Sequence, residues 1–128
     1  MKISKRAQYG LRAMVYMAKN QKKGNVIPLK ETSKAEAIPF NFLEKIIGQL
    51  EKAGLVSSKK GVQGGYILAK KSKNITAKDI VEALENTTAV DCSFCGKSKK
   101  CLTKNVWRKI DYSINKTLKS ITLARLIR

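Results

Sequence analysis

The sequence predicts a mainly α-helical protein: a winged helix-turn-helix with a small β-hairpin wing and a long C-terminal dimerisation helix. Three observations support this fold class. Three helical segments are predicted within residues 5–53, a glycine-rich basic turn separates two short apolar runs within 55–68, and an apolar stripe extends over 102–121. The expected divisions are a helix-turn-helix domain over 1–85, a cysteine-containing loop over 86–101, and the dimerisation helix with a C-terminal tail over 102–128.

The first helix is predicted over residues 5–19, because apolar side chains recur there at the 3.6-residue period. They are Ala7, Leu11, Met14, Val15 and Ala18. A polar stretch at 20–25 ends this helix, and Pro28 precedes a short second helix over residues 29–37.

A third helix follows Pro39, which is tolerated in a first helical turn. Its inward face is predicted to carry four apolar residues at i, i+3, i+4 and i+7, namely Leu43, Ile46, Ile47 and Leu50. Asn41 and Glu44 have the spacing of a capping box, which leaves the start of this helix open. Gly54 is the predicted C-terminal stop.

A β-hairpin is predicted next, with strands at 55–60 and 66–68 around the turn 61–65. Three helices followed by a hairpin is the order of a winged helix-turn-helix. The short loop before the third helix would place that helix to enter a DNA major groove, and the hairpin becomes the wing.

Two further helices complete the predicted fold. One starts at Thr76 as N-cap, with Asp79 at N3 and Ile75 and Ile80 as a hydrophobic staple, and it runs to about Glu85. The last carries the apolar stripe Leu102, Val106, Trp107, Ile110, Ile114, Leu118 and Ile121. A lone helix with such a stripe must bury it, either in its own core or, as we expect, against a second copy in a twofold dimer.

The charge favours a polyanionic partner. Lys and Arg number 27 and Asp and Glu 9 among 128 residues, giving a net charge of +18, and nucleic acid is the simplest partner for it. The chain has no His, which removes imidazole bases and Ser–His or Cys–His pairs, so we expect no enzymatic activity. No apolar run is long enough for a membrane helix and no signal peptide is apparent, so a cytoplasmic protein without a membrane partner is expected.

The candidate DNA contacts come from the third helix and the wing. On the helix, Asn41 and Glu44 are placed to read base edges, while lysines meet phosphates. The full candidate set is Phe40, Asn41, Glu44 and Lys45 on the helix with Lys59, Lys60, Gln63 and Gly64 on the wing.

The three cysteines, Cys92, Cys95 and Cys101, lie within ten residues in a polar, lysine-rich stretch. This clustering favours a metal or redox site over buried structural thiols. Three chemistries remain open at this point: an iron–sulfur cluster, a zinc site that would need a further ligand, and a Cys92–Cys95 thiol–disulfide switch.

Several stretches of the chain resemble the Rrf2 family of bacterial winged-helix regulators, and within it the iron–sulfur cluster regulators of the IscR and NsrR type. The resemblance covers essentially the whole chain. The stretches are YGLRAM (9–14), FLEKI (42–46), LEKAGLVSS (50–58), GVQGGY (61–66), CLT (101–103), WR (107–108) and ITL (121–123).

The resemblance implies a homodimeric transcriptional regulator whose affinity for double-stranded promoter DNA depends on an iron–sulfur cluster, 2Fe–2S or 4Fe–4S, that senses redox state, iron supply or nitric oxide. Cys92, Cys95 and Cys101 would be the cluster ligands. Lys104 stands where IscR-type members have a His, and Gln8 stands where the nitric oxide sensors have a carboxylate. The candidates for a fourth ligand are Asp91, which adjoins Cys92 in the sequence, and Gln8 of the partner subunit, which only the resemblance places there.

Two alternative functions remain. One is a transcription regulator that responds to thiol oxidation or zinc, and the other is a basic RNA- or ribosome-associated protein. Dimeric binding to short palindromic duplex DNA would separate a regulator from a protein that prefers structured RNA.

Overall fold

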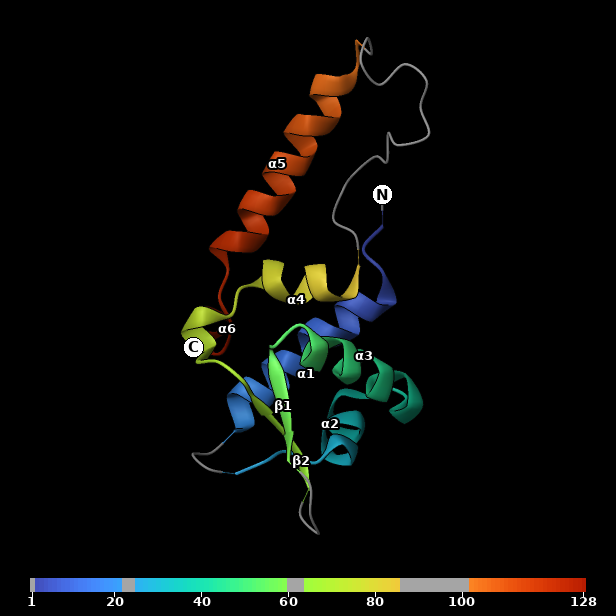
Figure 1. Cartoon of the computed structure of the whole chain (residues 1–128), viewed down its shortest axis with the longest axis vertical. Coiled ribbons are helices and arrows are strands. Elements are labelled where there is room, and N and C mark those ends of the chain that lie inside the picture. The colour runs from blue at the N-terminus through green and yellow to red at the C-terminus, as the bar shows by residue number, and fades with distance from the viewer. Residues whose placement is uncertain (1, 22–24, 60–63, 86–101) are drawn as a thin grey trace.

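The computed structural model describes residues 2–21, 25–59, 64–85 and 102–128. In these ranges the elements are α1 (Lys5–Asn20), α2 (Leu29–Glu36), α3 (Phe40–Lys52), β1 (Val56–Lys59), β2 (Gly65–Leu68), the short 3₁₀ helix η1 (Ser72–Asn74), α4 (Ala77–Leu84), α5 (Lys104–Ser120) and α6 (Leu123–Leu126). Figure 1 shows a head formed by the hairpin and all helices except α5, which projects away from it. The predicted mainly helical fold with a small hairpin is confirmed.

Side-chain caps fix the starts of α1 and α4. The Ala7 N–H donates to Ser4 Oγ at 3.1 Å. At α4, the Asp79 N–H donates to Thr76 Oγ1 at 3.1 Å and the Thr76 N–H donates to Asp79 Oδ2 at 2.9 Å. The predicted N-cap at Thr76 with Asp79 at N3 is therefore confirmed, and the two residues form a capping box.

The start of α3 differs from the predicted capping box. Pro39 is the N-cap and no side chain caps the helix, so Asn41 already lies in the first turn. The Leu43 N–H donates to the Pro39 carbonyl at 2.9 Å, and this bond closes the first helical turn. The helix therefore starts two residues earlier than a cap at Asn41 would require. The Asn41–Glu44 capping box is wrong, and both side chains are exposed instead.

The end of α3 turns the chain sharply into the hairpin. Gly54 has a φ of 79°, a conformation that glycine adopts without a Cβ penalty. The Leu55 N–H donates to the Leu50 carbonyl at 3.0 Å and the Gly54 N–H donates to the Glu51 carbonyl at 3.0 Å. This pair of bonds is a Schellman motif, and it confirms Gly54 as the helix stop.

The wing is an antiparallel pair in which Val56 faces Leu68 and Lys59 faces Gly65. A third segment, not predicted from the sequence, adds to it: the Ile27 and Tyr66 backbones exchange two hydrogen bonds of 2.9 Å. A Cβ on Gly65 would lie 2.5 Å from the Ile27 carbonyl oxygen, so this close approach requires glycine.

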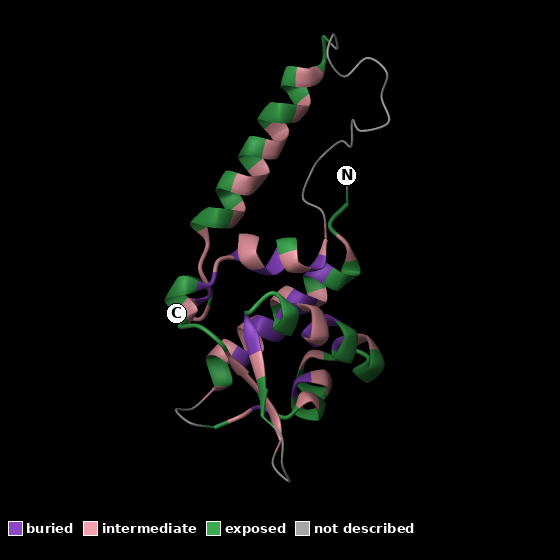
Figure 2. Cartoon of the chain, in the orientation of Figure 1, coloured by how far each residue is buried: buried purple, intermediate pink, exposed green. Residues whose placement is uncertain are grey.

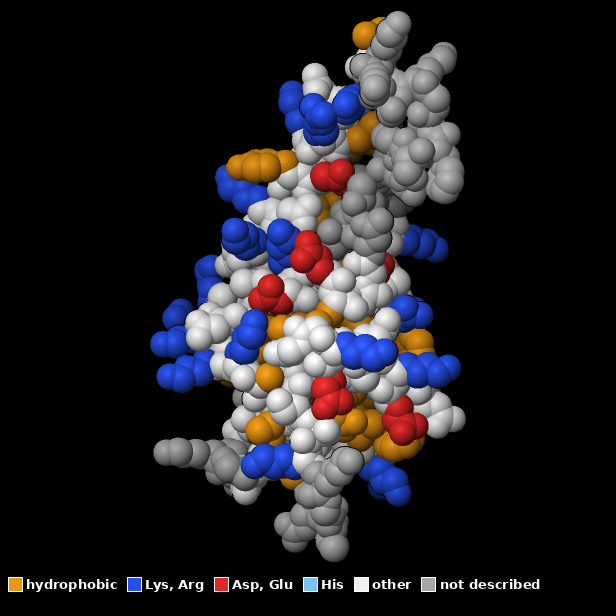
Figure 3. All heavy atoms as spheres, in the orientation of Figure 1, with side chains coloured by type: hydrophobic (Ala, Val, Ile, Leu, Met, Phe, Trp, Pro, Cys, Tyr) orange, Lys and Arg blue, Asp and Glu red, His pale blue; other side chains and the backbone are white. Residues whose placement is uncertain are grey.

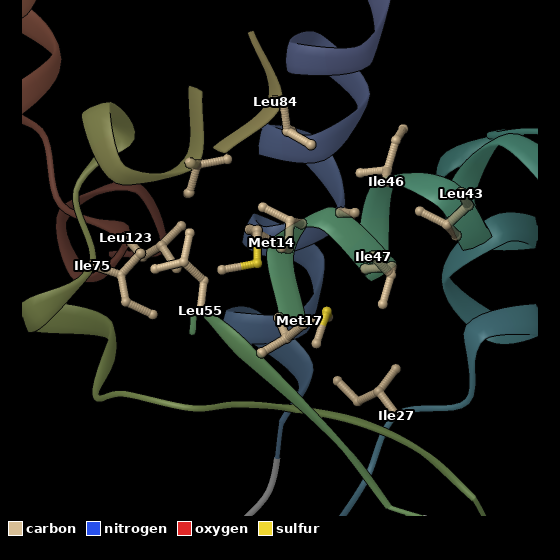
Figure 4. Close-up of a cluster of buried hydrophobic side chains, with 14 of the residues drawn as sticks. Met14, Met17, Ile27, Leu43, Ile46, Ile47, Leu55, Ile75, Leu84 and Leu123 are labelled. Atoms are coloured by element: carbon tan, nitrogen blue, oxygen red, sulfur yellow. The ribbon is translucent and has the colours of Figure 1, made fainter. Parts of the chain in front are cut away.

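The core lies between α1, α3 and α4. All four predicted inward residues of α3 are fully buried, and they meet Met14 and Met17 of α1 in one apolar cluster (Figure 4). Ile80 and Leu84 of α4 and Leu123 of α6 belong to the same cluster. The helix-turn-helix is thus positioned by packing against this buried cluster.

The C-terminal segment returns to the head, which the sequence did not predict. The Ala77 N–H donates to the Ile121 carbonyl at 2.8 Å, the Leu123 N–H donates to the Ile75 carbonyl at 2.9 Å, and Leu123 is fully buried. By contrast, no residue of α5 is buried (Figure 2). None of the helices in the described ranges is long and apolar enough to span a membrane.

Candidate nucleic-acid interface

The outer face of α3 carries the four side chains that were predicted from the sequence to contact DNA. Phe40 is 37% exposed although it is a large apolar residue at the first helical position. Asn41, Glu44 and Lys45 are also exposed, while the opposite face of the helix is buried in the core. The predicted division of α3 into an inward and an outward face is confirmed.

A shallow hollow joins α3 to the wing. Its volume is about 480 Å³, and it is lined by Leu29, Glu44, Ser58, Lys59, Gly64, Gly65 and Tyr66. Three predicted contact residues, Glu44, Lys59 and Gly64, therefore meet around one surface although they are up to 20 positions apart in the chain. Lys60 and Gln63 lie outside the described residues.

The hollow also contains groups that the sequence analysis missed. Tyr66 is half-buried, and burial, followed by repulsion from Glu51 and then Glu44, raises the pKa of its phenol. The phenol therefore stays protonated at neutral pH and can donate a hydrogen bond. Glu51 also accepts a hydrogen bond from the Ser58 N–H at 3.1 Å, which fastens β1 to α3. The position of Tyr66 directly after Gly64 and Gly65 was the available signal.

Contacts between α1 and α2 hold the helix-turn-helix. The Tyr16 hydroxyl donates to Glu31 Oε2 at 2.7 Å, and this hydrogen bond is the main cause that raises the pKa of Tyr16. Arg12 Nε lies 3.7 Å from Glu36 Oε1, and the Arg12 guanidinium also donates to the Glu36 carbonyl. Both acidic residues are thus bound to α1, Glu36 by an ion pair and Glu31 by a hydrogen bond from a neutral hydroxyl.

An aromatic contact joins α1 to α3. The Tyr9 and Phe42 rings meet edge to face with centroids 5.6 Å apart, and the Arg12 guanidinium lies 5.4 Å from the Tyr9 centroid. These contacts join α1 to α3 through Phe42, which is not one of the predicted DNA contacts.

The arrangement is suited to reading and holding a nucleic acid. An amide such as Asn41 can pair with adenine, a carboxylate such as Glu44 can accept from the cytosine amino group, and lysines hold phosphates. Within the described ranges, no group of three His, Cys, Asp or Glu residues could hold a metal ion.

The predicted cluster ligands Cys92, Cys95 and Cys101, and the candidate Asp91, lie outside the described residues. The residues on either side of this cysteine segment are described. Before it, the Glu85 carboxylate accepts hydrogen bonds from the Ser4 N–H at 3.1 and 3.4 Å. Gln8 is exposed one turn away on α1, where its N–H donates to the Ser4 carbonyl at 3.1 Å and its amide Nε2 donates to the Ile3 carbonyl at 2.8 Å. Gln8 therefore lies at the same end of α1 as the residue that leads into the cysteines.

Comparisons with known proteins agree with this geometry. Residues 3–128 match the profile of a family described as Rrf2, iron-dependent transcriptional regulator. The chain is 34% identical to the HTH-type transcriptional regulator IscR of Klebsiella pneumoniae over 131 residues, which covers 99% of this chain and 80% of that protein.

Two solved structures are similar over nearly the whole chain. IscR of T. potens is 38% identical with a TM-score of 0.82, and the match covers 99% of this chain and 86% of that one. CymR, described as the global cysteine regulator of B. subtilis, is 30% identical with a TM-score of 0.85, and covers 99% and 96%.

Proposed function

The chain belongs to the Rrf2 family of DNA-binding transcriptional regulators, and from this premise we propose that it is a homodimer whose binding to promoter DNA is controlled by an iron–sulfur cluster on Cys92, Cys95 and Cys101. Regulators of this family bind promoter DNA, typically as dimers, and are not enzymes. The observation that carries the DNA-binding part is the hollow in which Glu44 of α3 meets Lys59 and Gly64 of the wing.

In this proposal α3 enters the major groove and the wing follows the adjacent backbone. Asn41 and Glu44 read base edges, and Phe40 offers an apolar surface to a thymine methyl group. Lys45, Lys59 and Lys60 contact phosphates, and Gln63 and Gly64 approach the backbone at the tip of the wing. This assignment divides the residues that set sequence preference from those that set overall affinity.

The dimer forms through α5. Trp107, Ile110, Ile114 and Leu118 share one side of the helix, and all four are only half-buried in the single chain. A second copy packed on this side would remove their apolar surface from water, which is the usual driving force for a permanent twofold interface. Because α6 anchors the end of α5 to the head, such pairing also fixes the separation of the two α3 helices.

The chemistry of the donor set fits an iron–sulfur cluster. Thiolates are the usual ligands of such clusters, and the sequence places Lys97, Lys99, Lys100 and Lys104 beside the cysteines. These lysines favour thiolates over thiols and offset the negative charge of a thiolate-held cluster. The fourth ligand would be either Asp91, next to Cys92 in the same chain, or Gln8 of the partner subunit. When bound, the cluster, 2Fe–2S or 4Fe–4S, supplies a group that responds to redox state, iron supply or nitric oxide.

The Ser4–Glu85 contact offers a route from the cysteines to the head. It joins the residue that precedes the cysteine segment to the N-cap of α1, and α1 packs on both α3 and α4. A cluster bound by the cysteine segment would therefore act on the helix that supports α3. Couplings between two such sites typically amount to about 1–3 kcal/mol.

A thiol switch is the second candidate. One solved relative, CymR of Staphylococcus aureus, is described as an oxidized form and is 30% identical with a TM-score of 0.81. Oxidation of Cys92 and Cys95 to a disulfide needs no metal. Zinc is the third chemistry, although closed structural zinc sites take four ligands and this chain has three cysteines and no His.

The experiment combines cluster analysis with DNA binding. The protein is purified without oxygen, its visible absorption is recorded, and iron and sulfide are assayed. Promoter affinity is then measured at one salt concentration for loaded protein, cluster-free protein and the variant with all three cysteines changed to Ala. Different affinities of loaded and cluster-free protein support the proposal. Equal affinities in all three contradict it, and a Cys92–Cys95 disulfide in protein that never binds iron supports the thiol switch.

A further inference from the structure

Two basic segments that are far apart in the sequence meet on the head, where η1 packs against α6 at the base of α5. Residues 69–78 and 112–128 contain no Asp or Glu. The fold brings them together through a backbone bridge between Thr76 and Thr122, and η1 packs against α6. Because the joining bonds are made by backbone groups, the basic side chains of both segments remain on the surface.

Five exposed side chains from these segments form what we call the C-terminal basic patch: Lys70, Lys71, Lys73, Lys119 and Arg125. Figure 3 shows Lys and Arg side chains gathered along the edge where Figure 1 places α6 and the base of α5. Arg125 is held in place, since its guanidinium donates to the Ser120 carbonyl at 3.2 Å.

The acidic residues on the neighbouring helix α4 already have partners. Asp79 accepts the Thr76 N–H in the capping box, and Glu82 Oε1 lies 3.6 Å from Lys78 Nζ. None of the five patch residues has an ion pair among the described residues. The patch therefore presents five positive charges, none of which forms an ion pair with a described carboxylate.

The patch is separate from the surface that reads bases. Figure 1 shows α2 and α3 on one side of the hairpin and α6 with η1 on the other. No aromatic residue belongs to the patch, so it has no means to stack on bases. Its chemistry is that of a phosphate-binding surface, in which lysines act as point charges.

We propose that the C-terminal basic patch binds the phosphate backbone of duplex DNA outside the segment read by α3 and the wing, so that each subunit contacts the DNA twice. The inference rests on the proposed function. DNA is the polyanion that the head already holds, and a second site on the same molecule experiences it at a high effective concentration. An acidic protein is the competing occupant.

The test compares two variants that each lose two exposed charges. The patch variant is Lys71→Gln with Lys73→Gln, and the control is Arg108→Gln with Lys109→Gln on α5. A bound duplex is first selected from a random pool with the wild-type protein. Affinity is then measured over a range of salt for a duplex trimmed to the selected site and for one extended on each side by about two helical turns, roughly 20 base pairs.

We expect the wild type and the control to bind the extended duplex more tightly than the trimmed one, and the patch variant to lose this preference. On the extended duplex, the slope of log affinity against log salt should fall by about 2 per subunit in the patch variant, since each phosphate contact contributes about 0.9. A second pair, Lys70→Gln with Lys119→Gln, takes one charge from each segment and should reproduce the loss.

Three outcomes would overturn the inference. The first is a patch variant that keeps the preference for the extended duplex. The second is a wild type that binds both duplexes equally while the patch variant alone loses binding to polyglutamate, which would assign the patch to an acidic protein. The third is a wild type that selects no duplex at all, which would also contradict the proposed function, whereas the first two leave that function intact.

Discussion

Gly10 marks a close approach of α1 to Leu84 at the end of α4, and this contact can be tested quantitatively. A Cβ at Gly10 would collide with Leu84 Cδ1, and would lie 3.4 Å from Ile46 Cγ2 and 3.6 Å from Leu84 Cγ. Leu84 and Ile46 are both buried, so Leu84 has little room to move away. Overpacking of this kind costs about 1–3 kcal/mol.

Gly48 provides a matched control, because it also lies inside a helix and a Cβ there would have no neighbour within 4 Å. Replacing a helical glycine by Ala stabilises by about 0.5–1 kcal/mol. We therefore expect Gly48→Ala to raise the free energy of unfolding by that amount. Gly10→Ala gains the same term but also bears the collision, so it should fall between no change and a loss of about 2.5 kcal/mol.

The measurement is urea unfolding followed by circular dichroism, at one protein concentration because a dimer gains stability with concentration. The difference between the two variants isolates the packing term of about 1–3 kcal/mol. With a slope of about 2 kcal/mol per molar urea, that difference separates the midpoints by roughly 0.5–1.5 M. In a Leu84→Val background the Cδ1 atom is absent, so the penalty of Gly10→Ala should shrink. Equal midpoints for Gly10→Ala and Gly48→Ala would refute the close approach of α1 to α4.

Three further predictions concern the cap of α4, the phenol of Tyr16 and the apolar side of α5. Thr76→Ala removes the α4 cap and should lower the free energy of unfolding by about 0.5–2 kcal/mol, measured by the same urea titration; an unchanged midpoint would show that the cap adds nothing. Glu31→Gln should lower the raised pKa of Tyr16 in a spectroscopic titration, and Glu36→Gln, a weaker cause, should lower it less. Because the pKa of Tyr16 in the folded protein lies above its ordinary value of 10.0, the contact with Glu31 adds stability that is fully present below pH 10. This stability is lost as the pH rises through the raised pKa. Glu31→Gln should therefore lose less stability above pH 10 than the wild type. Ile114→Asp should yield monomers or unfolded chains in sedimentation, because it places a charge in the proposed dimer face; a stable dimer would mean that α5 packs elsewhere.

Local sequence signals were sufficient for most of the fold. The period of apolar residues located α1, α3 and α5, the Thr76–Asp79 pair located the start of α4, and Gly54 located the end of α3. Each of these signals depends on neighbouring residues alone, so it can be recognised without knowing the tertiary contacts of the chain. The capping box at Asn41 failed because two caps competed locally, and Pro39, which has no N–H to satisfy, was the one that the backbone used.

Elements fixed by distant backbone partners could not be predicted. The short helices η1 and α6 have too few residues for a periodic pattern, and Ile27 joins the wing only through its bridge to Tyr66. The same limit applies to the interface. Periodicity predicted which side of α3 is exposed, but the meeting of Glu44 with Lys59 and Tyr66 depends on how the wing folds back toward α3.

In the proposed function, the anchored end of α5 determines how a signal at the cysteines reaches the DNA. The helix has 17 residues and is therefore about 25 Å long. Its last turn leads directly into the backbone bonds from Ile121 and Leu123 to the head, so α5 and the head move together at that end. In a dimer paired through α5, a change of 10° in the crossing angle displaces the far end of a 25 Å helix by roughly 4 Å. Against a half-site spacing of about 34–36 Å, a shift of that size changes how well two α3 helices fit successive major grooves. The cysteine segment precedes the opposite end of α5. A displacement at that end, which is farthest from the anchored end, changes the crossing angle of the two helices directly.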